Sequence, residues 1–161
     1  MSLERGVEVS TSYQDPSRPE DERSAGAPAT STVEVRVAAQ AAQLAVMRAV
    51  VGDLAMRADF DVDSIADLRL AVDEACSSLV RVAAPEASLL CRFESGDDHI
   101  GVRAEVRSAD GSAPRKDTFS WRVLTALTDT VHTSVEPSEA AGGTGTHVVR
   151  IDLAKGRTGQ E

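Results

Sequence analysis

The chain is poor in aromatic residues, in cysteine and in long apolar runs, and each shortage excludes a class of protein. Aromatic residues make up 3% of the 161 residues, so a core must be aliphatic and drawn from the 42% that are hydrophobic. Two cysteines offer no disulfide framework of the kind a small secreted domain needs. No run reaches the roughly 18 apolar residues of a membrane span, and no N-terminal apolar run follows positive charge. The sequence therefore predicts a cytoplasmic protein without a membrane span.

The chain also lacks a surplus of basic residues. Its 26 acidic and 17 basic residues give a net charge of −9. Nucleic acids and anionic membranes require a basic face, so the composition argues against both as partners. An acidic surface is compatible with a protein partner that carries basic patches, such as a DNA-binding factor.

The length suits one domain with a proper core and is too short for two domains of ordinary size. Residues 1–32 are polar and show no periodic apolar pattern, which predicts a disordered N-terminal tail. Residues 33–154 alternate between strand and helix periodicities and form the predicted domain. Residues 155–161 are expected to be a short C-terminal tail.

The spacing of apolar residues predicts the elements of this domain in order. They are a strand at 33–37, a helix at 39–57, a second helix ending before 85, a hairpin of strands at 89–93 and 100–106, a third helix starting near 118, and strands at 131–135 and 149–153. Asp63 or Ser64 is the expected cap of the second helix, with Asp67 completing a loose capping box. Asp117 is the expected cap of the third helix. The fold class is an α/β (α+β) two-layer sandwich, with a mixed, mostly antiparallel sheet and helices on one face.

The second helix carries the most informative pattern. Apolar residues recur there at helical spacing, so one stripe can face a core; they are Ile65, Leu68, Val72, Ala75, Leu79 and Val82. Glu74 and Ser78 lie four residues apart, which places them on one face about one turn from each other. Nucleotide chemistry can use a carboxylate and a possible metal ligand in this arrangement. The alternative is the solvated polar face of an ordinary amphipathic helix.

The segment LRLAVDEACSSLV in this helix resembles the N-box helix of the anti-sigma-factor serine kinases, a bacterial branch of the GHKL (Bergerat-fold) ATPases. In that branch the segment typically reads LAVDEACTNAI. The order of elements from about Val33 to Leu153 also follows the family. The resemblance implies a Bergerat fold. It also implies an anti-sigma factor of the actinobacterial sigma-F type, in which the nucleotide boxes are degenerate.

The resemblance also implies a function. The chain is expected to form a homodimer and to sequester an alternative sigma factor of the sigma-B or sigma-F type. An anti-anti-sigma protein with a STAS-type fold is expected to compete for it. The alternative is an active serine kinase that uses ATP and Mg²⁺ to phosphorylate this antagonist and also sequesters the sigma factor. A third interpretation is the catalytic domain of a histidine kinase, and the lack of a histidine-bearing dimerisation helix ahead of the domain counts against it.

The resemblance assigns roles within the N-box. The family's glutamate acts as general base on a serine hydroxyl of the partner, and Glu74 occupies its position. Four residues later the family has an asparagine that holds Mg²⁺, and this chain has Ser78. A serine hydroxyl can also ligate Mg²⁺, although its side chain is shorter.

The other nucleotide boxes depart from the family pattern. The aspartate that contacts adenine belongs near Ser108, and the nearest candidates are Asp110 and Gly111. The alternative, which the residue types favour, is a simple turn dipeptide. Thr118 and Ser120 stand where the family has glycines that let backbone N–H groups meet phosphates.

Two further features belong to the same comparison. The run Gly142-Gly143-Thr144-Gly145-Thr146 matches the family's Gly-Thr before the last strand, with Gly143, Gly145 and Thr146 as candidate nucleotide contacts. A glycine-rich hairpin turn is the alternative. Trp121 is expected to anchor the third helix in the core rather than to stack on a base.

On the binding side, Arg48 falls at the position of an arginine that contacts the sigma factor in the family. A solvated arginine on an exposed helix face is the alternative. Cys76 and Cys91 are expected to be small buried residues, and a redox role for them stays open.

Overall fold

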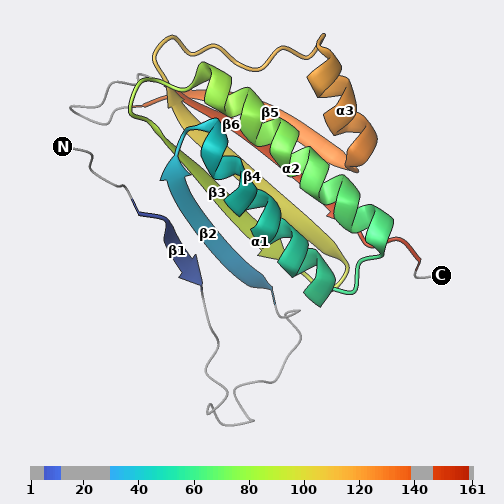
Figure 1. Ribbon diagram of the computed structural model, residues 1–161. Helices are drawn as coiled ribbons and strands as arrows, with labels where there is room; N and C mark the ends of the chain where they lie inside the picture. The colour runs from blue at the N-terminus through green and yellow to red at the C-terminus, as the bar shows by residue number, and fades with distance from the viewer. Residues whose placement is uncertain (1–5, 12–29, 139–146, 160–161) are drawn as a thin grey trace.

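The computed structural model describes residues 6–11, 30–138 and 147–159. In these ranges three α-helices lie against one face of a six-stranded sheet (Figure 1). In chain order the elements are β1 Glu8–Thr11, β2 Ser31–Ala38, a 3-10 turn Ala41–Gln43, α1 Leu44–Arg57, α2 Val62–Val82, β3 Ser88–Ser95, β4 His99–Ser108, α3 Phe119–Leu127, β5 Thr130–Pro137 and β6 His147–Gly156. The predicted two-layer sandwich with helices on one face is confirmed.

The strands run in the order β1-β2-β3-β4-β6-β5, and each neighbouring pair is antiparallel. The sheet is therefore wholly antiparallel over the described strands, where the sequence allowed a mixed one. Strands β3 and β4 form the predicted hairpin. The long pairing of β4 with β6 sets Ser108 opposite His147 and so fixes the end of β4 beside the start of β6.

The first helix begins later than the sequence predicts. Ala38 is the last residue of β2, and the backbone N–H of Ala39 donates to the Ala87 carbonyl at 3.0 Å. Gln40 is also extended, with φ −134° and ψ 144°. Because this bond holds the chain in strand-like geometry, a 3-10 turn intervenes and α1 starts only at Leu44.

Both predicted caps were wrong by one to three residues. Asp61 caps α2, because its backbone is extended and its carboxylate accepts a hydrogen bond from the Ser64 N–H at 3.4 Å. Thr118 caps α3 in the same way, accepting from the Trp121 N–H at 3.2 Å. Asp117 instead binds the Arg115 guanidinium. The predicted end of α2 is confirmed, since the helix stops at Val82, three residues before Pro85.

The predicted N-terminal tail contains a short strand. Residues Glu8–Thr11 form β1, which pairs with Val33–Arg36 along the outer edge of β2. All four side chains of β1 are exposed, so backbone hydrogen bonds rather than apolar burial hold the strand. At the other end, β6 continues to Gly156, two residues beyond the predicted domain boundary.

Helix α2 is the central helix of the layer, packed on the sheet between α1 and α3 (Figure 1). The predicted apolar stripe is confirmed, with Leu68, Val72, Ala75 and Leu79 buried and the two end positions partly buried. The core is mainly aliphatic, as expected from the few aromatic residues, and Phe93 is a fully buried exception. Trp121 packs against this core from α3, as predicted.

Cys76 of α2 and Cys91 of β3 meet inside the core. Both are buried, and their sulfur atoms lie 3.6 Å apart. The hydrogen bond with Cys76, followed by burial, raises the pKa of the Cys91 thiol well above its ordinary value. Both cysteines are thus buried packing residues, as predicted. In the described part of the chain no helix is long and apolar enough to cross a membrane.

Candidate functional site

Glu74 and Ser78 occupy one face of α2, as their spacing predicts, on the side that meets α3. Ser78 is nearly buried, at 9% exposure, and Glu74 is half-buried. The Ser78 hydroxyl donates to the backbone carbonyl of Glu74 at 2.9 Å. This bond to the preceding turn fixes the serine side chain against the helix.

The Glu74 carboxylate already has a hydroxyl partner in the chain. Ser120, in the first turn of α3, donates to Glu74 Oε2 at 2.8 Å. Its oxygen also lies 3.3 Å from that of Ser78. The three side chains form one cluster that ties α3 to α2. The sequence placed Ser120 at a glycine position of the family but gave no sign of its contact with Glu74.

A cavity of about 500 Å³ opens beside the cluster. Its volume lies within the range of roughly 300–1,000 Å³ that is common for small-molecule sites. It lies between the C-terminal half of α2, the loop after β4 and the start of α3. Its polar walls come from Ser78, Arg81, Arg115, Thr118 and Ser120, among others. Glu74 does not line it. Ser120 therefore stands between the carboxylate and the cavity.

The lining of this cavity suits a phosphate-bearing ligand. Arg81 and Arg115 bring guanidinium groups, which bind phosphates, and the N-terminal turn of α3 favours anions. Among the residues described, no group of three or more His, Cys, Asp or Glu side chains could hold a metal ion. Mg²⁺ that accompanies phosphates needs only one or two protein oxygens, and the hydroxyls of Ser78 and Ser120 lie at the wall. The two arginines and the hydroxyls are compatible with a phosphate-bearing ligand, and the lining in the described part of the chain includes no carboxylate for Mg²⁺.

Asp110 and Gly111 form a tight turn after β4. The Asp110 carboxylate accepts from the Ser112 N–H and the Ser108 hydroxyl, each at 3.0 Å, and these bonds hold the pKa of Asp110 below its ordinary value. Gly111 has φ +71°, and a Cβ built on it would approach the His147 ring to 3.0 Å. The pair thus has the geometry of a turn. Neither residue lines the cavity, so their contact with adenine stays a prediction.

The remaining predicted residues lie apart from this cluster. Gly143, Gly145 and Thr146 fall outside the residues that the structure describes. Arg48 lies on the outer side of α1, where its guanidinium pairs with the Asp73 carboxylate of α2. Its side chain is 44% exposed, so it remains accessible to a partner.

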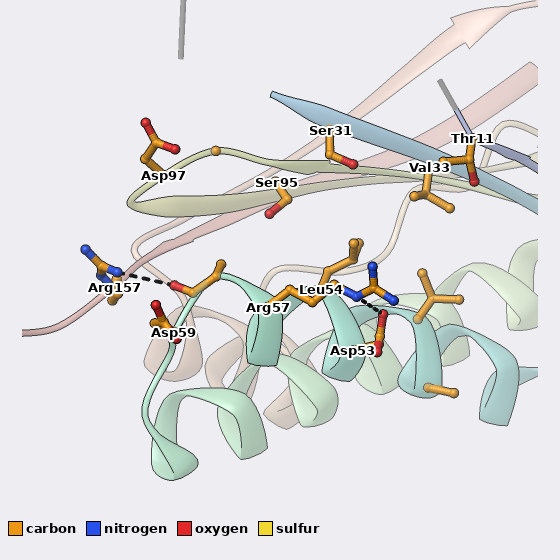
Figure 2. A pocket seen from close by; sticks show the side chains of 14 residues that line it. Thr11, Ser31, Val33, Asp53, Leu54, Arg57, Asp59, Ser95, Asp97 and Arg157 are labelled. Carbon is orange, nitrogen blue, oxygen red and sulfur yellow. Dashed lines mark hydrogen bonds and ion pairs between the residues drawn. The ribbon is translucent and has the colours of Figure 1, made fainter. Parts of the chain in front are cut away.

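A larger cavity of about 870 Å³ lies elsewhere, where α1 ends beneath the tips of β2 and β3. Figure 2 shows that its lining includes the Arg57–Asp53 ion pair, at 2.8 Å, and Arg157, which donates to the Ala58 carbonyl at 3.4 Å. None of the residues predicted from the sequence lines it. The smaller cavity is therefore the candidate site, because it alone of the two adjoins the Glu74 cluster.

Sequence reasoning also missed the two arginines of the site. Arg81 lies in the last turn of α2, three residues after Ser78, and its Nη2 is 3.5 Å from the Ser78 hydroxyl. That i, i+3 spacing was visible in the sequence. Arg115 lies in the loop before α3, where its Nη2 lies 2.6 Å from Asp117 Oδ2. No local sequence pattern predicts its place in the site.

Comparison with known proteins identifies the family of the chain. The chain is 43% identical over 101 residues to the anti-sigma-F factor RsbW of two Mycobacterium tuberculosis strains. The alignment covers 63% of this chain and 60% of each relative. This similarity and the observed layout confirm the resemblance and the Bergerat fold that the sequence predicts. Residues 37–150 match the family described as the histidine kinase-like ATPase domain. Since this match covers most of the chain, the protein belongs to the histidine kinase-like ATPase domain family.

Proposed function

We propose that the chain is an anti-sigma factor that sequesters an alternative sigma factor of the sigma-B or sigma-F type. The observation that carries this proposal is the 43% identity to proteins named anti-sigma-F factor over 101 residues. The net charge of −9 supports it, because a sigma factor binds DNA and offers basic surfaces to an acidic partner. In this proposal an anti-anti-sigma protein of STAS type competes for the chain and releases the sigma factor.

Arg48 is the proposed sigma contact. It is accessible on α1, and the Asp73 carboxylate holds its guanidinium in place beside α2. A preorganised arginine loses less conformational entropy on binding, and arginine is enriched among the residues that dominate interface energies. The same helix offers a matched control, since Arg57 is also exposed and also paired, with Asp53 at 2.8 Å.

The test is titration calorimetry of the full chain against a candidate sigma factor at about 0.15 M salt, near the physiological ionic strength. Arg48→Ala should weaken binding by at least about tenfold, the cost of losing roughly 1.4 kcal/mol. Arg57→Ala should leave the affinity within about twofold. Equal effects of the two changes would remove Arg48 from the interface. No binding by the unaltered chain to any sigma factor of this type would remove the proposal itself.

We also propose that the chain forms a homodimer. Strand β1 already covers the outer edge of β2, so pairing through that edge requires β1 to be displaced. The dimer is therefore expected to use the exposed side of α1. Analytical ultracentrifugation at micromolar concentration tests this, and a monomer throughout that range would contradict it.

A second candidate function is phosphorylation of the STAS antagonist. The observation that favours it is the Glu74 carboxylate, which holds the chain's own Ser120 hydroxyl at 2.8 Å beside a cavity with two arginines, a place that the antagonist's serine would have to take from Ser120. A general base must lie within this reach of the hydroxyl it deprotonates. Radiolabelled ATP with Mg²⁺, the chain and the antagonist tests it. Transfer to the antagonist that is lost in Glu74→Ala would support the kinase, and a chain without ATP binding in calorimetry would be a binding module alone.

A further inference from the structure

The contact of Ser120 with Glu74 places three parts of a phosphorylation reaction within one chain. A hydroxyl, a carboxylate that accepts its hydrogen bond at 2.8 Å, and a cavity suited to phosphates lie in sequence across the α2–α3 interface. In phosphoryl transfer the nucleophilic oxygen must lie between its base and the phosphorus atom. Ser120 lines the cavity and Glu74 does not, so the Ser120 hydroxyl is the member of this pair that a ligand in the cavity would meet.

We propose that Ser120 is a self-phosphorylation site, with ATP as the phosphoryl donor and Glu74 as the base. The Ser120 hydroxyl gives its proton to Glu74 while its oxygen forms a bond to the γ-phosphorus. The bond from the γ-phosphorus to the bridging oxygen breaks, and ADP leaves with that oxygen. This inference rests on the nucleotide binding in the second proposed function and is independent of sigma binding.

Thr118 and Ser78, which also line the cavity, lack this arrangement, whereas the Ser112 hydroxyl lines it with the Asp110 carboxylate as its partner and is the competing site that the mapping must distinguish. Thr118 Oγ1 donates to the Arg115 carbonyl and accepts from the Trp121 N–H, so its hydrogen serves the helix cap. Ser78 donates to a backbone carbonyl, which is no base. Ser108 does donate to a carboxylate, that of Asp110, but it is fully buried and does not line the cavity.

Some groups around a phosphorylated Ser120 would stabilise the added negative charge, and one would repel it. A phosphate on Ser120 lies in the first turn of α3, where the helix dipole favours negative charge, and Arg81 and Arg115 line the same cavity. It also lies against the Glu74 carboxylate, and two like charges at this distance repel each other. Modification therefore replaces the bond that ties α3 to α2 with a repulsion, so the amides of α3 should exchange with solvent faster.

The test incubates the full chain with ATP and Mg²⁺ and follows the intact mass, with the modified residue mapped by fragmentation. The unaltered chain should gain one phosphoryl group at Ser120. Ser77→Ala is the control, since Ser77 lies beside Ser78 on α2 but does not line the cavity, and it should behave like the unaltered chain. Ser120→Ala should gain none. Glu74→Gln should react at least about 100-fold more slowly, the lower range of general-base effects, while still binding ATP.

The kinetic order of the modification and a separate measurement of ATP binding distinguish failure of the Ser120 proposal from failure of the nucleotide proposal on which it rests. Within one chain, the fraction modified per minute should not change when the protein is diluted. A chain that binds ATP in calorimetry, or labels the antagonist, and leaves Ser120 unmodified overturns this inference alone. A chain that binds no ATP overturns the nucleotide proposal with it, whereas sigma binding is measured separately.

A measurement without nucleotide checks the contact itself. Ser120→Asp places a second carboxylate against Glu74, and Ser120→Asn places a neutral group of similar size there. Thermal unfolding at pH 7 should give the aspartate variant the lower midpoint. When Glu74→Gln is added to both variants, the deficit of the aspartate variant should disappear or reverse, because the first turn of α3 favours negative charge. Equal midpoints for the two variants would contradict the observed contact and the inference built on it.

Discussion

The bond between Ser120 and Glu74 can be measured as a coupling free energy. Glu74→Ala, Ser120→Ala and the double variant form a double-mutant cycle, which isolates the pairwise contribution. A hydrogen bond to a charged group contributes about 1.5–3 kcal/mol when well buried. Both side chains are half-buried and the bond length is 2.8 Å, so we expect a coupling of about 1 kcal/mol after discounting for solvent.

The assay is urea unfolding followed by far-UV circular dichroism, with the same cycle run on Asp53 and Arg57 as a control. That pair is exposed and spaced i, i+4, for which measured couplings are about 0.3–0.5 kcal/mol. The account predicts a coupling for the Ser120 cycle about twice that of the control or more. A Ser120 coupling equal to or below the control would refute the claim that this bond ties α3 to α2.

Three further predictions concern other parts of the site and core. Asp110 should titrate by NMR with a midpoint below the ordinary value of about 3.9, because its hydrogen bonds favour the ionised form. The stability that this carboxylate contributes is complete above the ordinary pKa and is lost as the pH falls through the lowered pKa. A midpoint at or above about 3.9 would contradict this prediction. Cys76 and Cys91 should react with Ellman's reagent only after unfolding, since both are buried and the pKa of Cys91 is raised, and rapid reaction of the native chain would contradict their packing. Gly111→Ala should destabilise the fold by about 1–2 kcal/mol in thermal or urea unfolding, because φ is +71° there, and a neutral effect would rule out that turn.

Local periodicity predicted most of the fold. The apolar stripe of α2 identified the face that packs on the sheet, because residues three and four apart share one side of a helix. Caps were harder to predict, since Asp61, Asp63 and Ser64 are all chemically suitable. Only the extended backbone at Asp61 decided which carboxylate faces the free N–H groups. Strand β1 escaped detection because it is only four residues long and buries no side chain, so the brief alternation of Val7 and Val9 with polar residues is a weak signal.

The candidate site could be predicted only in part. The resemblance and the helical spacing together identified Glu74 and Ser78 and placed them on one face. Ser120 reaches Glu74 across 46 positions of sequence, and no local pattern records such a contact. Sequence comparison marked Ser120 only as a departure from glycine, whereas the structure gives it a hydrogen-bond partner. The contact between Ser120 and Glu74 therefore became visible only in the packing of α3 on α2, because the residue spacing within α2 carries no information about it.

The most direct test of the central claim is transcription in a purified system. RNA polymerase with the candidate sigma factor is supplied with a promoter that this sigma factor recognises, and the chain is added in increasing amounts. The account predicts that transcript falls to background once the chain exceeds the sigma factor, and that transcript from the housekeeping sigma factor is unchanged. Undiminished transcript from the candidate sigma factor at excess chain would contradict sequestration.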